Sequence, residues 1–169
     1  AGKRMRFLSS GKPVDAAVFG SRGRAARVRV GMPPACLLKS FRLKALGRTL
    51  RVLLIDTGVP HAVVRVSSLD SFPVEALGRV LRRHKAFGKA GANVDFVSVG
   101  KERLGLRTYE RGVEAETLAC GTGAVAAAIA SWVWGRRRST ARVAVRGGAV
   151  LSVSLRPEAQ GVFSGVSLV

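Results

Sequence analysis

Hydrophobic side chains recur along the chain at two spacings, one typical of helices and the other typical of strands. In residues 74–81 they recur every three or four positions, as on the buried face of a helix. Phe72 and Pro73 precede this stretch and basic residues end it, so we expect a helix there. Residues 121–134 are rich in alanine and are followed by Gly135, which predicts a second helix.

A third helix is expected in residues 16–30, which are rich in alanine and arginine, although Gly20 and Gly23 disfavour it. Residues 4–29 and 104–130 then share one order of elements, namely strand, loop, glycine-rich turn and alanine-rich helix. This weak similarity is consistent with two related halves.

Alternation of hydrophobic and polar residues predicts strands in much of the remaining chain. Two of these strands flank Leu46-Gly47-Arg48, which is a good signal for a hairpin. A mostly antiparallel sheet with two or three helices indicates the α+β class rather than alternating α/β. The predicted strands are residues 4–8, 41–45, 49–55, 62–66, 94–99, 104–109 (paired with 94–99), 141–145, 149–155 and 161–169.

Length and composition are those of one ordinary domain, or of two small lobes that share a core. Of the 169 residues, 47% are hydrophobic and 20 are glycine, which is a globular composition. The longest apolar run, residues 124–134, is too short to span a bilayer, and no secretory segment opens the chain. We therefore expect a cytoplasmic protein without membrane contact. Two cysteines, Cys36 and Cys120, are too few for a disulfide framework.

Charge is the unusual feature, because 29 Lys and Arg against 10 Asp and Glu give a formal net charge of +19. A field of that strength favours polyanions and anionic substrates, so nucleic acid is one hypothesis for a partner. The arginines are nevertheless scattered. The densest groups, residues 82–85 and 136–138, lie where the predicted helices end, and there cations complement the helix dipole. We prefer the interpretation that the charge forms a solvated basic surface.

The candidate chemistry lies in residues 107–124, RTYERGVEAETLACGTGA. Cys120 directly precedes Gly121-Thr122-Gly123 and the predicted helix. A thiol at a helix N-terminus is expected to have a lowered pKa, because the helix end favours its thiolate. The glycines let a ligand approach the backbone, whose free N–H groups bind a carboxylate or a phosphate.

Two charged residues upstream extend this picture. Arg111 offers a guanidinium for a carboxylate, and Glu110 offers a carboxylate for an ammonium. Together these groups are suited to hold an amino acid by both of its main-chain ends, with a thiol beside it.

Simpler interpretations of the same residues stay open at this point. A lone cysteine beside glycine is more often a small buried residue. The Gly-Thr-Gly run is also consistent with a tight turn, and the lysine of a P-loop and the dinucleotide fingerprint are both missing. Glu110-Arg111 is also consistent with a surface pair. The residues alone therefore indicate a thiol site at a helix end and no particular reaction.

The run YERGVEAETLACGTGA (residues 109–124) resembles the second catalytic signature of diaminopimelate epimerases, and it is long and specific. Residues 56–63, DTGVPHAV, resemble the family's Gly-Asn-Pro-His element, and residues 93–96, NVDF, resemble its Asn-Val-Asn-Phe element. Residues 146–148 and 161–165 resemble the closing strands. The likeness covers residues 51–169 and extends less clearly to residues 4–7.

The resemblance implies two similar lobes, each a mostly antiparallel sheet around a central helix, with the substrate clamped between them. One cysteine from each lobe faces the α-carbon from opposite sides. The implied reaction inverts LL-diaminopimelate to the meso form, in lysine and peptidoglycan precursor synthesis, with no metal and no pyridoxal cofactor. One thiolate removes the α-proton and the other thiol delivers a proton to the opposite face.

Carried over by position, the resemblance makes Cys120 the acid/base of the second lobe. The other implied site residues surround the substrate: Gly121 and Thr122 supply N–H groups to the α-carboxylate, Glu110 and Arg111 bind its ammonium or far carboxylate, Asn93 hydrogen-bonds it, and His61 lines the site near Cys120.

The first lobe departs from the family pattern. Its cysteine–glycine signature is expected to follow the strand at residues 4–7, but the matching residues 15–24 contain no cysteine. Cys36, in a segment with two prolines, does not match it, and Val59 replaces the family's asparagine before Pro-His. We therefore expect residues 1–50 to be a remnant of the first lobe and residues 51–169 to be the second epimerase lobe, which carries the Cys120 signature.

An incomplete first lobe leads to several hypotheses. The chain is an epimerase-like isomerase, or an amino-acid- or anion-binding module that has lost its chemistry, or a basic protein associated with nucleic acid. Missing strands would leave apolar surface and a sheet edge uncovered, so a homodimer or a partner chain is expected to cover the first lobe.

Overall fold

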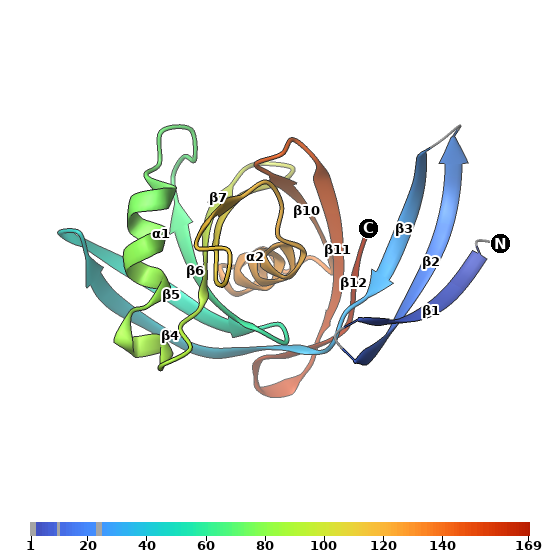
Figure 1. The fold of residues 1–169 in the computed structure, drawn as a ribbon, viewed down its shortest axis with the longest axis horizontal. Helices are drawn as coiled ribbons and strands as arrows, with labels where there is room; N and C mark the ends of the chain where they lie inside the picture. The colour runs from blue at the N-terminus through green and yellow to red at the C-terminus, as the bar shows by residue number, and fades with distance from the viewer. Residues whose placement is uncertain (1–2, 10, 23–24) are drawn as a thin grey trace.

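The computed structural model describes residues 3–9, 11–22 and 25–169, and these form an α+β fold dominated by strands (Figure 1). The two α-helices are α1 (Val74–Arg82) and α2 (Gly121–Val133), with short 3-10 turns at Lys85–Phe87 and Ala159–Gly161. The strands are β1 (Lys3–Ser9), β2 (Lys12–Arg22), β3 (Ala25–Gly31), β4 (Ala35–Ala45), β5 (Arg48–Asp56), β6 (Pro60–Val66), β7 (Asn93–Val99), β8 (Leu104–Glu110), β9 (Ala115–Thr117), β10 (Thr140–Val145), β11 (Val150–Pro157) and β12 (Val162–Leu168).

Within the described ranges the strands join into a single sheet that curls around α2. Its order is β1-β2-β3-β12-β11-β10-β8-β7-β6-β5-β4, and β9 pairs with β8. Only the β6–β7 and β8–β10 pairs are parallel, so the sheet is mixed but mostly antiparallel. A further pairing of β12 with β4 brings the two ends of the body together, which leaves α2 surrounded by strands (Figure 1).

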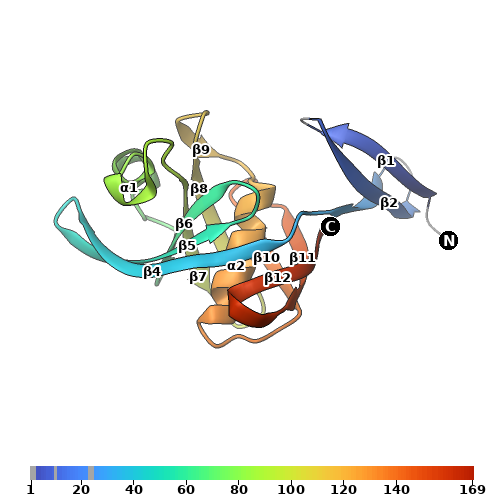
Figure 2. The same ribbon diagram turned by 90° about the horizontal axis from the view of Figure 1, so that it is seen from below.

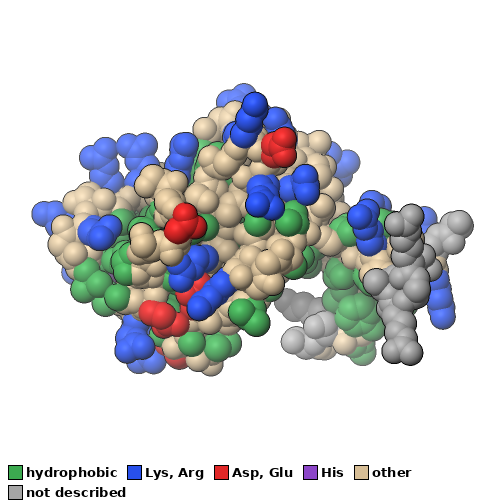
Figure 3. Space-filling model, turned by 90° about the horizontal axis from the view of Figure 1, so that it is seen from above, with side chains coloured by type: hydrophobic (Ala, Val, Ile, Leu, Met, Phe, Trp, Pro, Cys, Tyr) green, Lys and Arg blue, Asp and Glu red, His purple; other side chains and the backbone are tan. Residues whose placement is uncertain are grey.

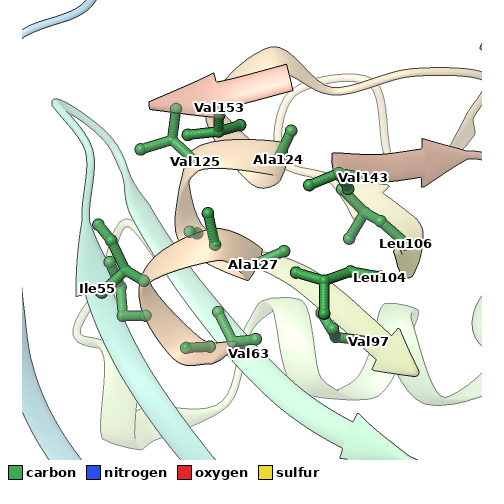
Figure 4. Close-up of a cluster of buried hydrophobic side chains, with 14 of the residues drawn as sticks. Ile55, Val63, Val97, Leu104, Leu106, Ala124, Val125, Ala127, Val143 and Val153 are labelled. Atoms are coloured by element: carbon green, nitrogen blue, oxygen red, sulfur yellow. The ribbon is translucent and has the colours of Figure 1, made fainter. Parts of the chain in front are cut away.

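Helix α2 is apolar on every side because it lies at the centre of the body. All residues from Gly123 to Ser131 are buried, and most of them are alanine, whose small side chain allows strands to approach from several directions. Figure 4 shows the resulting core, in which the alanines of α2 face branched side chains of the surrounding strands. Among these are Ile55, Val63, Val97, Leu104, Leu106, Val143 and Val153.

A second core lies on the outer face of the sheet, under α1. The helix buries Leu77 and Leu81 against side chains such as Phe96 and Tyr109. Gly78 lets α1 lie directly on β8, because a Cβ at this position would be only 2.4 Å from the Cβ of Tyr109. The sheet is therefore buried on both faces where β5 to β8 pass between the two helices.

Most of the elements expected from the sequence are confirmed. The hairpin of β4 and β5 turns at Leu46-Gly47, and β7 pairs with β8 in antiparallel fashion. Helices α1 and α2 lie where the sequence predicted helices, at residues 74–81 and 121–134. Of the described helices, none is long and apolar enough to cross a membrane.

The predicted helix at residues 16–30 is wrong, because this segment forms β2 and β3. Alternating valines outweigh the alanine content: Val18 on β2 lies opposite Val28 on β3, and β-branched side chains favour strands. Gly20 also has a φ of +60°, which a right-handed helix excludes. Gly23 lies outside the described residues.

The expected repeat, in which residues 4–29 would share the order of elements of residues 104–130, is also wrong. Residues 15–22, which were matched to the cysteine–glycine signature of a first lobe, belong to a strand and not to a loop followed by a helix. Within the described part of the first fifty residues there are strands alone, so a central helix of a first lobe is not found there. Strands β1 to β3 form a ribbon that projects from the helix-centred body (Figure 2).

The sheet is continuous across the expected lobe boundary at residue 50. Strand β4 pairs with β5 over nearly its whole length, from Cys36 opposite Asp56 to Ala45 opposite Arg48. The chain then links β4 to β3 through the short segment at residues 32–34.

Candidate active site

Cys120 is the N-cap residue of α2, as the glycine-rich run after it predicts. Its extended backbone (φ −127°, ψ 111°) brings the side chain back over the first turn, and Sγ accepts a hydrogen bond from the N–H of Gly123 at 3.3 Å. The hydroxyl of Thr122 lies 3.4 Å from the same sulfur. The carbonyl of Cys120 accepts from the N–H of Ala124 at 2.9 Å.

The first two N–H groups of α2 are available to a ligand. The first four N–H groups of a helix have no partner within the helix, and here Cys120 takes those of Gly123 and Ala124. Among the described residues, no protein acceptor is found for the N–H groups of Gly121 and Thr122. This end of α2 is consequently suited to bind a carboxylate.

The expectation of a lowered pKa for the Cys120 thiol is wrong. Burial of the side chain and the nearby negative charge of Asp95 raise the pKa to about 12. Smaller contributions come from Thr122 and Gly123, which lower the pKa, and from Glu110, which raises it. The favourable helix end is outweighed because burial disfavours a charged sulfur. Cys120 is therefore a protonated thiol at neutral pH.

A buried hydrogen-bonded group lies directly beneath this helix end. The carboxylate of Asp95 accepts hydrogen bonds from the Thr108 hydroxyl at 2.7 Å and from His61 Nδ1 at 2.6 Å. The side chains of His61 and Asp95 are both 0% exposed. Gly123 makes this approach possible, since a Cβ there would be 2.8 Å from Asp95 Oδ1. The carboxylate thus lies against the first turn of α2.

Asn93 connects this group to the loop after β8. Its amide nitrogen lies 3.4 Å from the carbonyl oxygen of Pro60 and 3.4 Å from His61 Nε2. Its amide oxygen accepts from the backbone N–H of Arg111 at 2.8 Å. Neighbouring parallel strands explain the proximity, because His61 on β6 lies opposite Asn93 on β7.

Glu110 and Arg111 lie at the end of β8, where the chain turns back into β9. The turn is held by Glu114, whose carbonyl accepts from the Tyr109 hydroxyl at 2.6 Å. The Glu114 carboxylate also accepts from Arg82 at 2.7 Å. Hydrogen bonds from the Gly112 N–H and from Arg82 lower the pKa of Glu114. The predicted site residues from β6, β7, the β8–β9 turn and α2 are therefore brought together at one end of the central helix.

Glu116 on β9 is a buried carboxylate that positions the segment leading to Cys120. Arg107 binds both of its oxygens, at 2.6 and 2.7 Å, and Arg146 contacts it at 2.6 Å. The N–H of Glu116 donates to the Glu75 carboxylate at 2.8 Å. These contacts tie β9 to β8, to the β10–β11 turn and to α1.

Sequence reasoning missed Asp95, Thr108 and Glu116. All three lie on strands and pair with side chains from neighbouring strands, so the local sequence carries no sign that they are buried and paired. A weak signal was the acidic residue within the NVDF run, where a buried strand would otherwise be apolar.

Cys36 lies on β4, paired with Asp56 on β5 and Val162 on β12. Both cysteines are free. Burial, with a smaller effect of Asp56, raises the pKa of the Cys36 thiol. No group of three or more His, Cys, Asp and Glu side chains that could hold a metal ion is found in the described ranges.

The fold is shared with solved structures whose sequences differ widely from this one. A probable proline racemase from Agrobacterium radiobacter superimposes with a TM-score of 0.72 at 17% identity, covering 99% of this chain and 56% of that one. A protein of the PhzF family of phenazine biosynthesis from Bacillus anthracis has a TM-score of 0.74 at 10% identity, covering 98% and 64%. At such low identity these likenesses establish the fold alone.

Sequence comparison places the chain more narrowly. The sequence model of the diaminopimelate epimerase family matches residues 53–164. The diaminopimelate epimerase of Aquifex aeolicus is 38% identical over 164 residues, covering 96% of this chain and 58% of that protein. That of Chlorobaculum tepidum is 38% identical over 154 residues, covering 90% and 57%. The chain belongs to the diaminopimelate epimerase family, and it spans less than two thirds of the length of these relatives.

Proposed function

We propose that this chain contributes one half of the active site of an amino-acid epimerase, and that its substrate is diaminopimelate. The observation that carries the proposal is the placement of Cys120 at the N-terminus of α2, beside the free N–H groups of Gly121 and Thr122. Membership of the family supports the reaction class. The proposed reaction is the cofactor-independent inversion of LL-diaminopimelate to the meso form, as a step in lysine and peptidoglycan precursor synthesis.

When the α-proton is removed from the opposite face of the α-carbon, Cys120 would donate the new proton from its own face. A thiol with a pKa of about 12 holds its proton until negative charge develops on the α-carbon. The N–H groups of Gly121 and Thr122 would bind the α-carboxylate and stabilise the charge that spreads onto it in the transition state. After donation, the resulting thiolate is the base for the reverse reaction.

The remaining site residues would bind and orient the substrate. Arg111 supplies a cation for a carboxylate and Glu110 an anion for an ammonium group. Asn93 is proposed to hydrogen-bond the substrate while it holds the backbone of Arg111. His61 would line the site from below.

Inversion also requires an acid/base group on the other face of the α-carbon. We propose that residues 1–50 are what this chain has of the first lobe and that residues 51–169 are the second lobe. The acid/base group of that face would then come from other polypeptide that completes the first lobe, for example a second copy of the chain or a partner chain.

The ribbon of β1 to β3 offers a surface for that partner. One face of it is apolar: Met5 and Phe7 are 42% and 45% exposed, and Val28 shares their face. The opposite face is charged and carries the Arg6–Asp15 ion pair at 2.6 Å. Strand β1 is also an edge of the described sheet, so its backbone is free to pair.

The test is hydrogen exchange at the α-carbons of LL- and meso-diaminopimelate in D2O under reducing conditions, followed by NMR. Cys120→Ala is expected to abolish any exchange, whereas Cys36→Ala, which changes the other cysteine and none of the proposed site residues, is expected to leave it unchanged. Exchange with inversion would show a complete epimerase. Exchange without inversion would show a half-site with one competent face. Absence of exchange by the folded protein would reject the proposal.

A second candidate is a binding module on the same fold, favoured by the burial and high pKa of Cys120. It predicts that diaminopimelate binds with no exchange of the α-proton.

A third candidate is association with nucleic acid, which the net charge of +19 suggests. Figure 3 shows Lys and Arg side chains spread over one face of the molecule rather than gathered in one stripe. Binding to DNA that does not weaken steeply with salt would rule out this candidate.

A further inference from the structure

The hydrogen bonds beneath Cys120 have only one consistent direction. Asn93 is oriented by Arg111, whose backbone N–H requires the amide oxygen as its acceptor. The amide nitrogen of Asn93 therefore faces the Pro60 carbonyl and His61 Nε2, and it donates to both. Because His61 Nε2 accepts a hydrogen bond, it carries no proton.

The other ring nitrogen of His61 is then the protonated one. A neutral imidazole has one donor and one acceptor nitrogen, so Nδ1 carries the proton and donates it to Asp95 Oδ2 at 2.6 Å. Thr108 donates to the other carboxylate oxygen at 2.7 Å. Arg111 thus donates to Asn93, which donates to His61. His61 and Thr108 both donate to Asp95, which is the acceptor at the end of the network.

The charge of Asp95 is not cancelled by a cation. No Lys or Arg side chain in the described ranges forms an ion pair with it, and its histidine partner is neutral in this network. The carboxylate lies against Gly123 in the first turn of α2, the residue whose N–H donates to the Cys120 sulfur. The charged or titratable groups that act on Cys120 are Asp95 from β7 and Glu110 from β8.

We propose that Asp95 is the positioning residue of this site: its carboxylate fixes the proton of His61 on Nδ1, and its uncancelled charge beneath α2 adds to the burial that keeps Cys120 as a thiol. The catalytic meaning of this inference rests on the proposed function, because a thiol is the form that donates a proton. The contacts themselves do not depend on turnover. Asp95 would also hold the Arg111 backbone in place through His61 and Asn93.

The first test uses the unsubstituted protein and the tautomers of its two histidines. His84 Nδ1 accepts from the Ala86 N–H at 3.2 Å, so neutral His84 carries its proton on Nε2. In 15N-histidine NMR at about pH 8.5, where an ordinary histidine is neutral, the two rings are expected to show opposite tautomers. His84→Gln assigns the signals. A His61 ring protonated on Nε2, or averaged between tautomers, would overturn the proposal.

The second test separates the charge of Asp95 from its hydrogen bonds. Asp95→Asn has nearly the same shape, and its amide can still accept from His61 and donate to Thr108. The His61 signal is therefore expected to keep its Nδ1-protonated form. The Cys120 titration is expected to move, with its midpoint falling by about one pH unit or more once the negative charge is gone.

Thiolate absorbance near 240 nm measures this midpoint, in a Cys36→Ser background and as the difference from the same protein with Cys120→Ala. Thr108→Val is the matched control, because it alters the same buried contact and keeps the charge. Its midpoint is expected to stay as high as that of the parent. An unchanged midpoint in Asp95→Asn, or an equal fall in Thr108→Val, would reject the role of the charge.

These outcomes are distinct from those of the exchange assay. Opposite histidine tautomers and a shifted thiol midpoint, with no exchange on diaminopimelate, would uphold the role of Asp95 and reject the epimerase. Exchange that needs Cys120, with an unshifted midpoint in Asp95→Asn, would uphold the epimerase and reject the role of Asp95.

Discussion

At the scale of single residues, the site depends on which charges are buried beside a thiol. Cys120 combines two opposing influences, since hydrogen bonds at the helix end favour its thiolate while burial and Asp95 disfavour it. Burial and Asp95 have the larger effect, because a thiolate removed from water loses more solvation free energy than two weak hydrogen bonds to its sulfur restore. The resting form of the site is consequently the acid.

The raised pKa of Cys120 predicts a loss of stability in alkali. The folded protein holds the proton up to about pH 12, whereas an unfolded cysteine releases it near pH 8.5. The stabilising contribution is thus complete below about pH 8.5 and is lost as the pH rises toward 12, by up to about 1.4 kcal/mol per pH unit.

Urea unfolding between pH 8 and pH 11 measures this effect, with Cys36→Ser as the parent so that a single thiol titrates. Replacing Cys120 by serine in that parent is expected to remove this part of the pH dependence. Free energies of unfolding that fall in parallel for the two proteins would contradict the prediction.

At the scale of elements, two contacts made by strands decide the positions of α1 and of the turn between β8 and β9. Helix α1 approaches β8 through Gly78, and β9 is held by the buried carboxylate of Glu116. Neither contact reaches Cys120 directly. Both nevertheless position β8 and β9, and Glu110 and Arg111 lie where the chain turns from one strand to the other.

Gly78→Ala is expected to destabilise the fold although alanine is the better helix former. The new Cβ would be 2.4 Å from the Tyr109 Cβ, so α1 must move off the sheet. Overpacking of this kind costs about 1–3 kcal/mol, against about 1 kcal/mol of helix propensity gained. Urea unfolding measures the difference. Val80→Ala, at an exposed position of the same helix, is the control and is expected to change stability by less than about 0.5 kcal/mol. Equal stability of Gly78→Ala and the parent would refute the tight contact.

Glu116→Gln is expected to lower the free energy of unfolding by about 3 kcal/mol. The Glu116 side chain is 1% exposed and Arg107 is largely buried, so the substitution leaves a guanidinium without its counter-charge. Arg146→Gln removes the half-exposed partner and is expected to cost about 1 kcal/mol or less. Denaturant unfolding of both variants tests the order, and a reversed order would show that Arg107 does not depend on Glu116.

At the scale of the whole molecule, one helix-centred body is well packed and one ribbon is not. Helix α2 is enclosed on all sides, whereas β1 to β3 stand apart from the body and expose an apolar face (Figure 2). Exposed apolar surface next to a free strand edge favours association with another chain.

We expect the chain to form a species larger than its monomer mass of 17.9 kDa, measured by light scattering during gel filtration. The double substitution Met5→Lys and Phe7→Lys places charge on the apolar face and is expected to yield a monomer. Leu8→Lys, on the opposite face of the same strand, is the control and should leave association unchanged. A monomeric parent protein would argue for a separate partner chain instead of a homodimer.

The sequence by itself determined most of the elements of the helix-centred body. The helical spacing in residues 74–81 belongs to a helix with one buried face, and the alanine-rich residues 121–134 belong to a helix buried on every side. The alternating runs from residue 41 onward belong to strands, so local pattern and final structure agree. The thiol at the helix end also followed from the order cysteine, glycine, threonine, glycine, because that order places an N-cap side chain over free N–H groups.

The tertiary structure alone decided the rest. Residues 16–30 became strands because their valines found partners across a ribbon, a choice that composition left open. Asp95, His61 and Thr108 come from three strands, and their network exists only once β6, β7 and β8 lie side by side beneath α2. The protonation state of Cys120 likewise depends on burial and on a charge 25 positions away in the chain, and local sequence carries neither.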